Sequence, residues 1–227
     1  MNTRRLLLIF LTLILAGSVM APVWAKKSLP SMNDEGMQLI EKSKLDSLYA
    51  DPNADLSSYK RVMLLDASVA FKKNWKRDQN RGYALKVKDR DMVKIQEDIA
   101  SLLDEVFTKE LIDAGYTMSD EPGDDVLLVK PAIVDLDVTA PDIATSTVTR
   151  SFSESAGEMT LNLELFDSLS NDKIATATDR SHDNWRGYIQ WRTSVSNRAD
   201  ARRMMSRWAK GLTSALDDAN ASATASR

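Results

Sequence analysis

The sequence predicts an α+β fold: a two-layer sandwich in which two amphipathic helices cover one face of a mostly antiparallel sheet. Apolar residues recur at three- and four-residue steps in two long segments, 89–115 and 198–219, as in helices with one buried stripe. Between them lie three consecutive strand-like stretches, 125–138, 157–166 and 174–181. No helix separates these stretches, so antiparallel neighbours are favoured and a Rossmann or barrel alternation is not.

The N-terminus has the pattern of an export signal. Two arginines precede a strongly apolar run of eleven residues, Leu6 to Ala16. This run is shorter than the roughly 20 residues of a membrane span and suits the apolar region of a signal peptide. Of two small-residue sites, "VWA" is favoured over "VMA", because Pro22 follows the latter. We expect cleavage after Ala25, which removes residues 1–25; an uncleaved membrane anchor is the alternative.

Length and composition of the remaining chain predict a single domain without covalent cross-links. Cleavage leaves 202 of the 227 residues, and the formal net charge changes from −3 to −5 because two basic residues and no acidic ones are lost. Since there is no cysteine, neither a disulfide nor a lipidated cysteine can form. We expect a soluble periplasmic protein with no lipid anchor, and the acidic balance argues against nucleic-acid binding. The expected parts are a flexible segment 26–36, one α+β domain 37–219 and a disordered tail 220–227.

The first part of the domain predicts two strands. Met37–Ile40 suits a short edge strand, and Val62–Phe71 is apolar enough for a mostly buried strand. Turn-rich sequence around Pro52 separates them. Lys72–Lys88 is interpreted as a polar loop that carries Trp75.

The first long helix begins at Asp89, which can cap its N-terminus, and Asp91 suits the positive end of the helix dipole. Gly115 stands where a left-handed C-terminal residue is expected. The expected buried stripe consists of Met92, Ile95, Ile99, Leu102, Leu103, Val106, Phe107 and Leu111.

The three strands that follow differ in how clearly they alternate. In the first, Pro131 cannot donate a ladder hydrogen bond, so this strand is expected at an edge or bulged there. Its apolar residues of one parity are Val126, Leu128, Ala132, Val134, Leu136 and Val138, with Asp135 and Asp137 on the other. The second strand directs Met159, Leu161, Leu163 and Leu165 to one face. In the third, Ala175 and Ala177 are small inward-facing residues that leave room for a crossing helix.

The second long helix is expected from Arg198 to Ala219, capped by Asn197 with Asp200 three residues later. Its apolar stripe is Ala201, Met204, Met205, Trp208, Leu212, Ala215 and Leu216. It also carries the basic residues Arg198, Arg202, Arg203, Arg207 and Lys210. These could meet anionic lipid headgroups or an acidic partner, or form a solvated face paired with nearby acids.

Catalytic chemistry has little support in the sequence. His182 is the only histidine, and without cysteine no histidine-pair metal site or Cys/His nucleophile can be built. Phosphate-binding glycine loops are absent, and no cofactor is expected. The best remaining candidates are the carboxylates Asp135, Asp137 and Asp142, which could hydrolyse a glycoside or hold a divalent cation. Acids on the wet face of a strand are equally what solubility requires.

The stretch "NWRGYIQWR", residues 184–192, concentrates aromatic and basic side chains. Its candidate contact residues are Trp185, Arg186, Tyr188, Trp191 and Arg192. Aromatic rings flanked by arginines can stack on sugars or anchor a protein contact. They can equally pack a loop against the edge of the sheet, and the sequence leaves both interpretations open.

Three phrases of the sequence resemble a bacterial envelope family known as domain of unknown function 3313. They are "ADLSSYKRVMLLDASVAFKKNW" (54–75), "DVLLVKPAIVDLDVTAPD" (125–142) and "SAGEMTLNLELFDS" (155–168), and the resemblance extends over about residues 37–219. Many members look like lipoproteins, whereas this chain has no cysteine to acylate. The resemblance implies an exported protein and no agreed activity, cofactor or catalytic residue.

The sequence therefore predicts a periplasmic, non-catalytic binding or accessory module of the cell envelope. The expected partner is another envelope protein or glycan, with weak contact to a membrane surface as a further option. The alternatives are a carboxylate-dependent hydrolase of envelope glycan and a membrane-apposed protein that uses its basic helix.

Overall fold

The strands of one mixed sheet and the helices packed on it form the protein, which confirms the α+β class. The computed structural model describes residues 29–41, 43–82, 86–138, 151–153, 157–182, 190–192 and 194–225. The large sheet contains β1 (Gln38–Leu39), β2 (Ser47–Ala50), β3 (Arg61–Leu64), β4 (Ser68–Phe71), β5 (Thr117–Met118), β6 (Val126–Val138), β8 (Gly157–Asp167) and β9 (Lys173–His182). A separate ladder joins β7 (Ser151–Ser153) to β10 (Gln190–Arg192). The helices are η1 (Leu56–Ser58), α1 (Trp75–Gly82), α2 (Asp89–Asp113) and α3 (Ser194–Ala225).

The large sheet is antiparallel on one side and parallel on the other. Its strand order is β1-β2-β9-β8-β6-β3-β5, and β4 pairs with β6 beyond the end of β3. Pairs from β1 to β6 are antiparallel, whereas β3 and β4 run parallel to β6, and β5 parallel to β3. The parallel part exists because α2 connects β4 to the later strands, and such a crossover returns the chain in the same direction.

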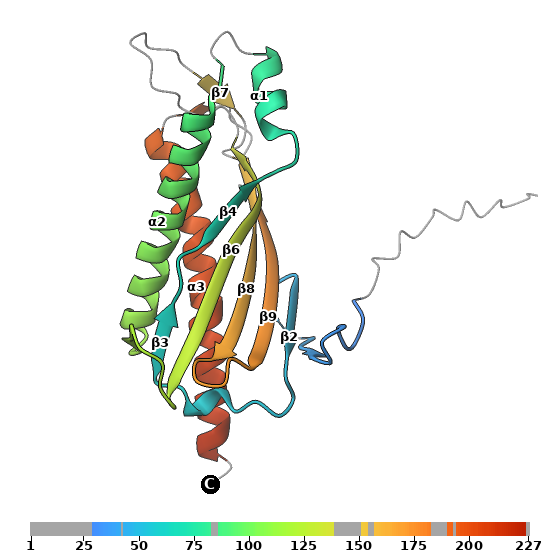
Figure 1. The fold of residues 1–227 in the computed structure, drawn as a ribbon, viewed down its shortest axis with the longest axis vertical. Coiled ribbons are helices and arrows are strands. Elements are labelled where there is room, and N and C mark those ends of the chain that lie inside the picture. The colour runs from blue at the N-terminus through green and yellow to red at the C-terminus, as the bar shows by residue number, and fades with distance from the viewer. Residues whose placement is uncertain are drawn as a thin grey trace, which may run out of the picture.

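The core lies between the sheet and the two long helices, which cover one of its faces (Figure 1). Phe107 and Leu103 of α2 and Met205 of α3 are fully buried in it. On β8, the predicted inward residues Met159, Leu161, Leu163 and Leu165 are all buried. Ala175 and Ala177 of β9 are also buried in this core, as predicted. None of the described helices lies over the opposite face of the sheet (Figure 1).

The predicted parity of β6 is wrong over most of the strand. Leu127, Val129 and Ile133 belong to the core, whereas Leu128 is only half-buried. The pairing of β6 with β8 shifts between Val134 and Asp137, and Asp135 adopts a positive φ of 52°. This bulge reverses the alternation, so that the core residue after it is Leu136.

Pro131 lies in the middle of the sheet and pairs regularly with Leu163, so the predicted edge position, or a bulge at Pro131, is wrong. The predicted strand 62–71 is broken into β3 and β4. Leu64 pairs with Val129 and Ser68 pairs with Ala132, so Pro131 lies opposite the break between β3 and β4. A residue without an amide hydrogen is tolerated in a central strand here because its parallel neighbour is interrupted.

Both long helices form, with different boundaries from those predicted. The N-cap of α2 is Lys88, not Asp89, and the Asp91 carboxylate accepts a hydrogen bond of 2.8 Å from the Lys88 amide. Gly115 has the expected positive φ, 93°. Helix α3 already begins at Ser194, so Asn197 is not its cap.

The C-terminal end of α3 also differs from the prediction. The helix continues to Ala225, past the predicted end at Ala219, so residues 220–225 are helical where a disordered tail is predicted. The Asn220 side-chain amide donates to the Leu216 carbonyl at 2.9 Å and to the Tyr116 hydroxyl at 3.2 Å. These contacts hold the helix end against the end of the sheet.

The described part of the N-terminal segment, residues 29–36, makes specific contacts although the sequence predicts a flexible segment. The Asn33 side chain accepts hydrogen bonds from the Glu35 and Met37 amides. Lys173 Nζ lies 2.6 Å from a Glu35 carboxylate oxygen, and the Tyr49 hydroxyl donates to the Pro30 carbonyl at 3.0 Å. Within the described ranges, none of the helices combines the length and apolar character that a bilayer crossing requires.

Candidate functional site

The described part of the predicted contact stretch lies at one end of the molecule, which we call the α1 end (Figure 1). This end comprises α1, the β7–β10 ladder and the adjoining ends of β6, β8 and β9. Strand β10 places Trp191 opposite Phe152 and Arg192 opposite Ser151. Trp185, Arg186 and Tyr188 lie outside the described residues.

Helix α1 is attached to the end of β6 through a shared acceptor. The Val138 carbonyl accepts hydrogen bonds of 3.2 Å from both Trp75 Nε1 and Gln79 Nε2, one helical turn apart. The Trp75 side chain is 3% exposed and stacks on Phe71 with 4.2 Å between ring centroids. Trp75 is therefore an anchor in the interior, and the segment predicted as a polar loop contains a docked helix.

The connection from α1 to α2 is closed by polar contacts. The Asn80 side chain accepts from the Val87 amide at 2.7 Å and donates to the Val87 carbonyl at 3.2 Å. Lys76 Nζ lies 2.5 Å from an Asp89 carboxylate oxygen. These contacts fix α1 beside the N-terminus of α2.

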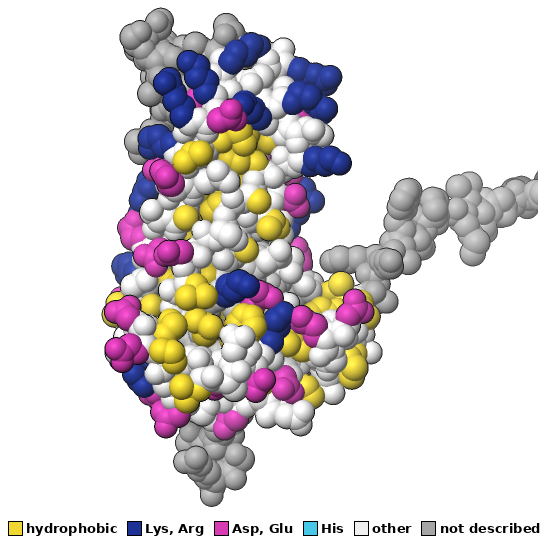
Figure 2. Space-filling view, viewed as in Figure 1, with side chains coloured by type: hydrophobic (Ala, Val, Ile, Leu, Met, Phe, Trp, Pro, Cys, Tyr) yellow, Lys and Arg dark blue, Asp and Glu magenta, His cyan; other side chains and the backbone are white. Residues whose placement is uncertain are grey.

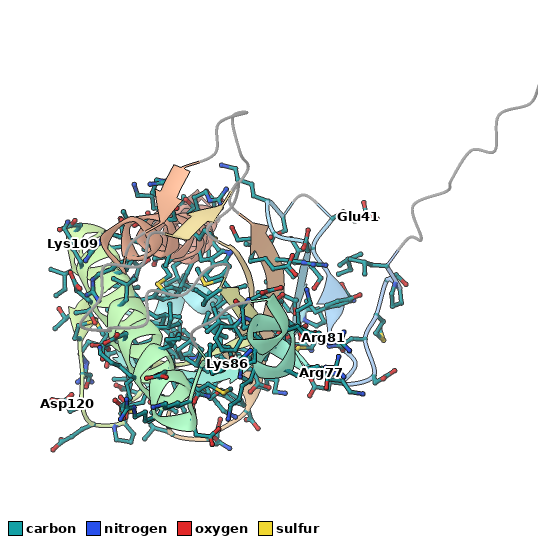
Figure 3. The ribbon with its side chains drawn as sticks, turned by 90° about the horizontal axis from the view of Figure 1, so that it is seen from above. Glu41, Arg77, Arg81, Lys86, Lys109 and Asp120 are labelled. Atoms are coloured by element: carbon teal, nitrogen blue, oxygen red, sulfur yellow. The ribbon has the colours of Figure 1, made fainter. Side chains whose placement is uncertain are left out.

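The outer surface of the α1 end is strongly basic. Between Lys72 and Lys94 the chain has nine lysines and arginines but only three acidic residues. Seen from above, Arg77, Arg81 and Lys86 cluster around α1 (Figure 3). The same end carries most of the dark blue side chains in Figure 2. The run of positive charge is visible in the sequence. Helix α1, which carries part of this charge, has too few apolar residues to be recognised from the sequence.

The predicted carboxylate group is neutralised by cations in its described part. Lys72 Nζ lies 3.0 Å from both Asp137 and Glu158, and Arg180 Nη2 lies 2.5 Å from Glu158. The hydrogen bond from Arg180, aided by Lys72, lowers the pKa of Glu158. Glu158 is thus held as a carboxylate, and this ion network does not provide the protonated acid that glycoside hydrolysis needs.

Of the other two carboxylates in that group, the structure describes only Asp135. Asp135 is exposed on the bulge of β6, and Asp142 lies outside the described residues. Only the backbone of His182 is described, at the end of β9 opposite Glu158. In the part of the chain that the structure describes, no three acidic or histidine side chains group closely enough to hold a metal ion.

The basic residues of α3 are largely engaged with acids inside the fold. Arg198 and Arg202 lie 3.1 and 2.8 Å from the Glu105 carboxylate of α2. The hydrogen bond from Arg202 is the main cause of a lowered pKa at Glu105. Arg203 pairs with Asp200 on the same helix. The contacts match the interpretation of a solvated face paired with nearby acids.

Comparison with known proteins identifies the family. A family model described as "Protein of unknown function (DUF3313)" matches residues 31–212. The chain belongs to this family. The match confirms the resemblance found in the sequence and covers nearly all of the described fold. No curated protein sequence matches this DUF3313 chain.

The solved structures that match this DUF3313 protein are distant from it in sequence and have low TM-scores. The PelC dodecamer from Paraburkholderia phytofirmans is 9% identical, with a TM-score of 0.36 over 73% of this chain and 96% of that one. A minor lipoprotein from Acinetobacter baumannii is 12% identical, with a TM-score of 0.31 over 68% and 90% of the two chains. A DUF4136 family protein from Bacteroides thetaiotaomicron is 11% identical, with a TM-score of 0.33 over 73% and 95%.

Proposed function

We propose that this chain is an exported, non-catalytic binding or accessory protein of the bacterial cell envelope. The observation that carries the proposal is the N-terminal arginine pair followed by the apolar run Leu6–Ala16 and the small-residue site at Ala25. The family description assigns no reaction to its members. The neutralised ion network around Lys72 and Glu158 further favours binding over catalysis.

Within this proposal, the contact surface is the stretch that ends in β10. It consists of Trp185, Arg186, Tyr188, Trp191 and Arg192, and the partner is another envelope protein or a glycan. Support comes from the position of β10 at one end of the molecule, in a two-stranded ladder outside the main sheet. Rigid aromatic rings beside arginines are the residues most enriched at contact hot spots.

Export is tested first, by expressing the full chain in a bacterial host and fractionating the cells. The processed protein should appear in the periplasmic fraction with Lys26 as its first residue. Retention of the unprocessed chain in the cytoplasm would contradict the proposed location, and an uncleaved chain in the membrane fraction would indicate an anchor.

The contact surface is tested by crosslinking in intact cells with the variant Trp185→Ala/Tyr188→Ala/Trp191→Ala. The crosslinked partner should be lost while thermal unfolding stays close to that of the parent protein. Phe166→Ala is a matched control, because this half-buried aromatic lies on β8 outside the α1 end. Unchanged crosslinking by a folded triple variant would refute the surface. If the triple variant unfolds, Arg186→Gln/Arg192→Gln tests the same surface through charge alone.

A further inference from the structure

The charges of the molecule are separated along its long axis. At the end opposite α1, residues 113–125 contain five acidic residues and no basic one. Figure 2 shows dark blue side chains gathered at the α1 end and magenta ones prevailing toward the other end. Helices α2 and α3 both begin at the α1 end, so the positive ends of their dipoles point the same way as the lysines and arginines (Figure 1).

Several cations of the α1 end have no acidic partner among the described residues. Lys73, Arg81, Lys86 and Lys88 are exposed, and none of them takes part in an ion pair within the described ranges. Among the described acids, Arg77 and Arg90 each pair only with the aspartate next to them in sequence, and their side chains stay 59% and 77% exposed. Unlike Arg198 and Arg202 of α3, these cations are not paired with acids on another element of the described structure, and the Lys86 Nζ donates only to the nearby Asn80 carbonyl.

We propose that the α1 end is a docking surface for the anionic, phosphate-bearing headgroups of a phospholipid membrane. The cations stand on a protruding helix and its connection to α2, spread over one end of the molecule (Figure 3). Long lysine and arginine side chains in such an arrangement interact with the potential of a charged surface. The acidic opposite end is repelled by the same surface, so the long axis is held away from the membrane.

This surface differs from the basic helix that the sequence suggested for membrane contact. The arginines of α3 contact Glu105 and Asp200 and would have to leave these acids to meet a headgroup. Docking through α1 breaks at most the exposed pairs Arg77–Asp78 and Arg90–Asp91, which contribute little to stability. The α1 end is therefore the better site for an anionic lipid surface.

The test is co-sedimentation of the chain from Lys26 onward, which keeps every described residue, with lipid vesicles. One vesicle set contains phosphatidylcholine alone and the other equal parts of phosphatidylcholine and phosphatidylglycerol. We expect binding only to the anionic vesicles, and we expect it to fall when salt is raised from about 0.1 M to about 1 M, because the screening length shortens from about 10 Å to about 3 Å.

The deciding variant is Lys73→Gln/Arg77→Gln/Arg81→Gln, which removes three exposed charges of the α1 end. Each cation near an anionic surface strengthens partitioning by roughly fivefold, so the triple variant should bind at least roughly tenfold more weakly. The matched control is Lys44→Gln/Lys60→Gln/Lys109→Gln, which removes three exposed lysines away from α1 and changes the net charge equally. It should bind like the parent protein.

Three results would overturn the proposal: no binding to anionic vesicles at low salt, equal binding to neutral vesicles, or equal losses in the two triple variants. Concentration-dependent light scattering without vesicles, abolished only in the α1 variant, would instead show that the basic end binds the acidic end of a second copy of the chain.

The biological setting rests on the proposed export, but vesicle binding is measured on purified protein. Failure of export and failure of docking are therefore separate outcomes.

Discussion

The two ends of this molecule use charged side chains in opposite ways. At the acidic end, carboxylates close the structure by accepting hydrogen bonds from distant parts of the chain. The Tyr59 hydroxyl donates to Asp167 at 2.9 Å, and the Tyr116 hydroxyl donates to Asp217 at 3.1 Å. Arg61 Nε contacts both oxygens of Asp125 at 2.9 and 3.0 Å. Charge at this end is part of the fold.

At the α1 end, a buried aromatic ring joins separate parts of the chain, as the carboxylates do at the acidic end. Trp75 is buried against Phe71, while Lys73, Arg77 and Arg81 on and beside the same helix stay exposed. The helix is held by the Trp75 ring, the Gln79 and Asn80 side chains and the Lys76–Asp89 pair. None of these contacts involves Lys73, Arg77 or Arg81. Charged groups at the acidic end thus join distant parts of the chain, whereas Lys73, Arg77 and Arg81 make no such long-range ion pair among the described residues.

Substitution of Trp75, which anchors α1, should have the largest effect on stability. Trp75→Ala should lower the free energy of unfolding by about 3 kcal/mol, because it removes a fully packed ring and its hydrogen bond to Val138. Urea unfolding measures the loss, and limited proteolysis should show earlier cleavage in residues 72–88. Trp75→Phe keeps a ring against Phe71 and should lose only about 1 kcal/mol. Equal stability of Trp75→Ala and the parent protein would show that α1 is not held by this ring.

The acidic end should lose stability in alkaline solution. Burial, and then the hydrogen bonds to Asp167 and Asp217, raise the pKa of Tyr59 and of Tyr116 to about 12. In the unfolded chain these tyrosines ionise near pH 10. Their contribution to stability is therefore complete below pH 10 and is lost as the pH rises from 10 to about 12. Chemical unfolding across this range, with tyrosinate absorbance to follow ionisation, checks the prediction; early titration of both tyrosines in the folded protein would contradict it.

Removing one hydroxyl tests the same end at neutral pH. Tyr59→Phe deletes the hydrogen bond to a charged acceptor and should cost about 1.5 kcal/mol. Tyr49→Phe is the matched control, because its hydroxyl donates to the neutral Pro30 carbonyl, and it should cost about 0.5 kcal/mol. Thermal or urea unfolding distinguishes the two, and equal costs would mean that the charge of Asp167 adds nothing.

The smallest effect is expected from the cations of the α1 end. Lys73→Gln/Arg77→Gln/Arg81→Gln should change the free energy of unfolding by less than about 0.5 kcal/mol, because these side chains are exposed and make no contact that closes the fold. A loss of several kcal/mol would abolish the distinction between the two ends.

The sequence by itself determined the elements whose pattern is local. The periodic stripe of α2, the alternation of β8 and the positive φ of Gly115 all follow from residues within one helix or strand. The alanines at positions 175 and 177 of β9 were likewise identified as inward-facing from their size and parity, and both are buried. The family resemblance came from three phrases of the sequence, of which one, 155–168, covers β8, and the family match confirms it.

Only the tertiary structure decided the elements that depend on a distant neighbour. The bulge at Asp135 reverses the face of β6, and the break between β3 and β4 makes room for Pro131. Helix α1 has too few apolar residues for a helical pattern to be recognised in the sequence. It is held by hydrogen bonds to the Val138 carbonyl, about sixty residues away in the chain. The candidate site was therefore found only in part. The sequence pointed to the stretch ending at Arg192, whereas the basic surface at the same end of the molecule exists because α1 folds onto the end of β6.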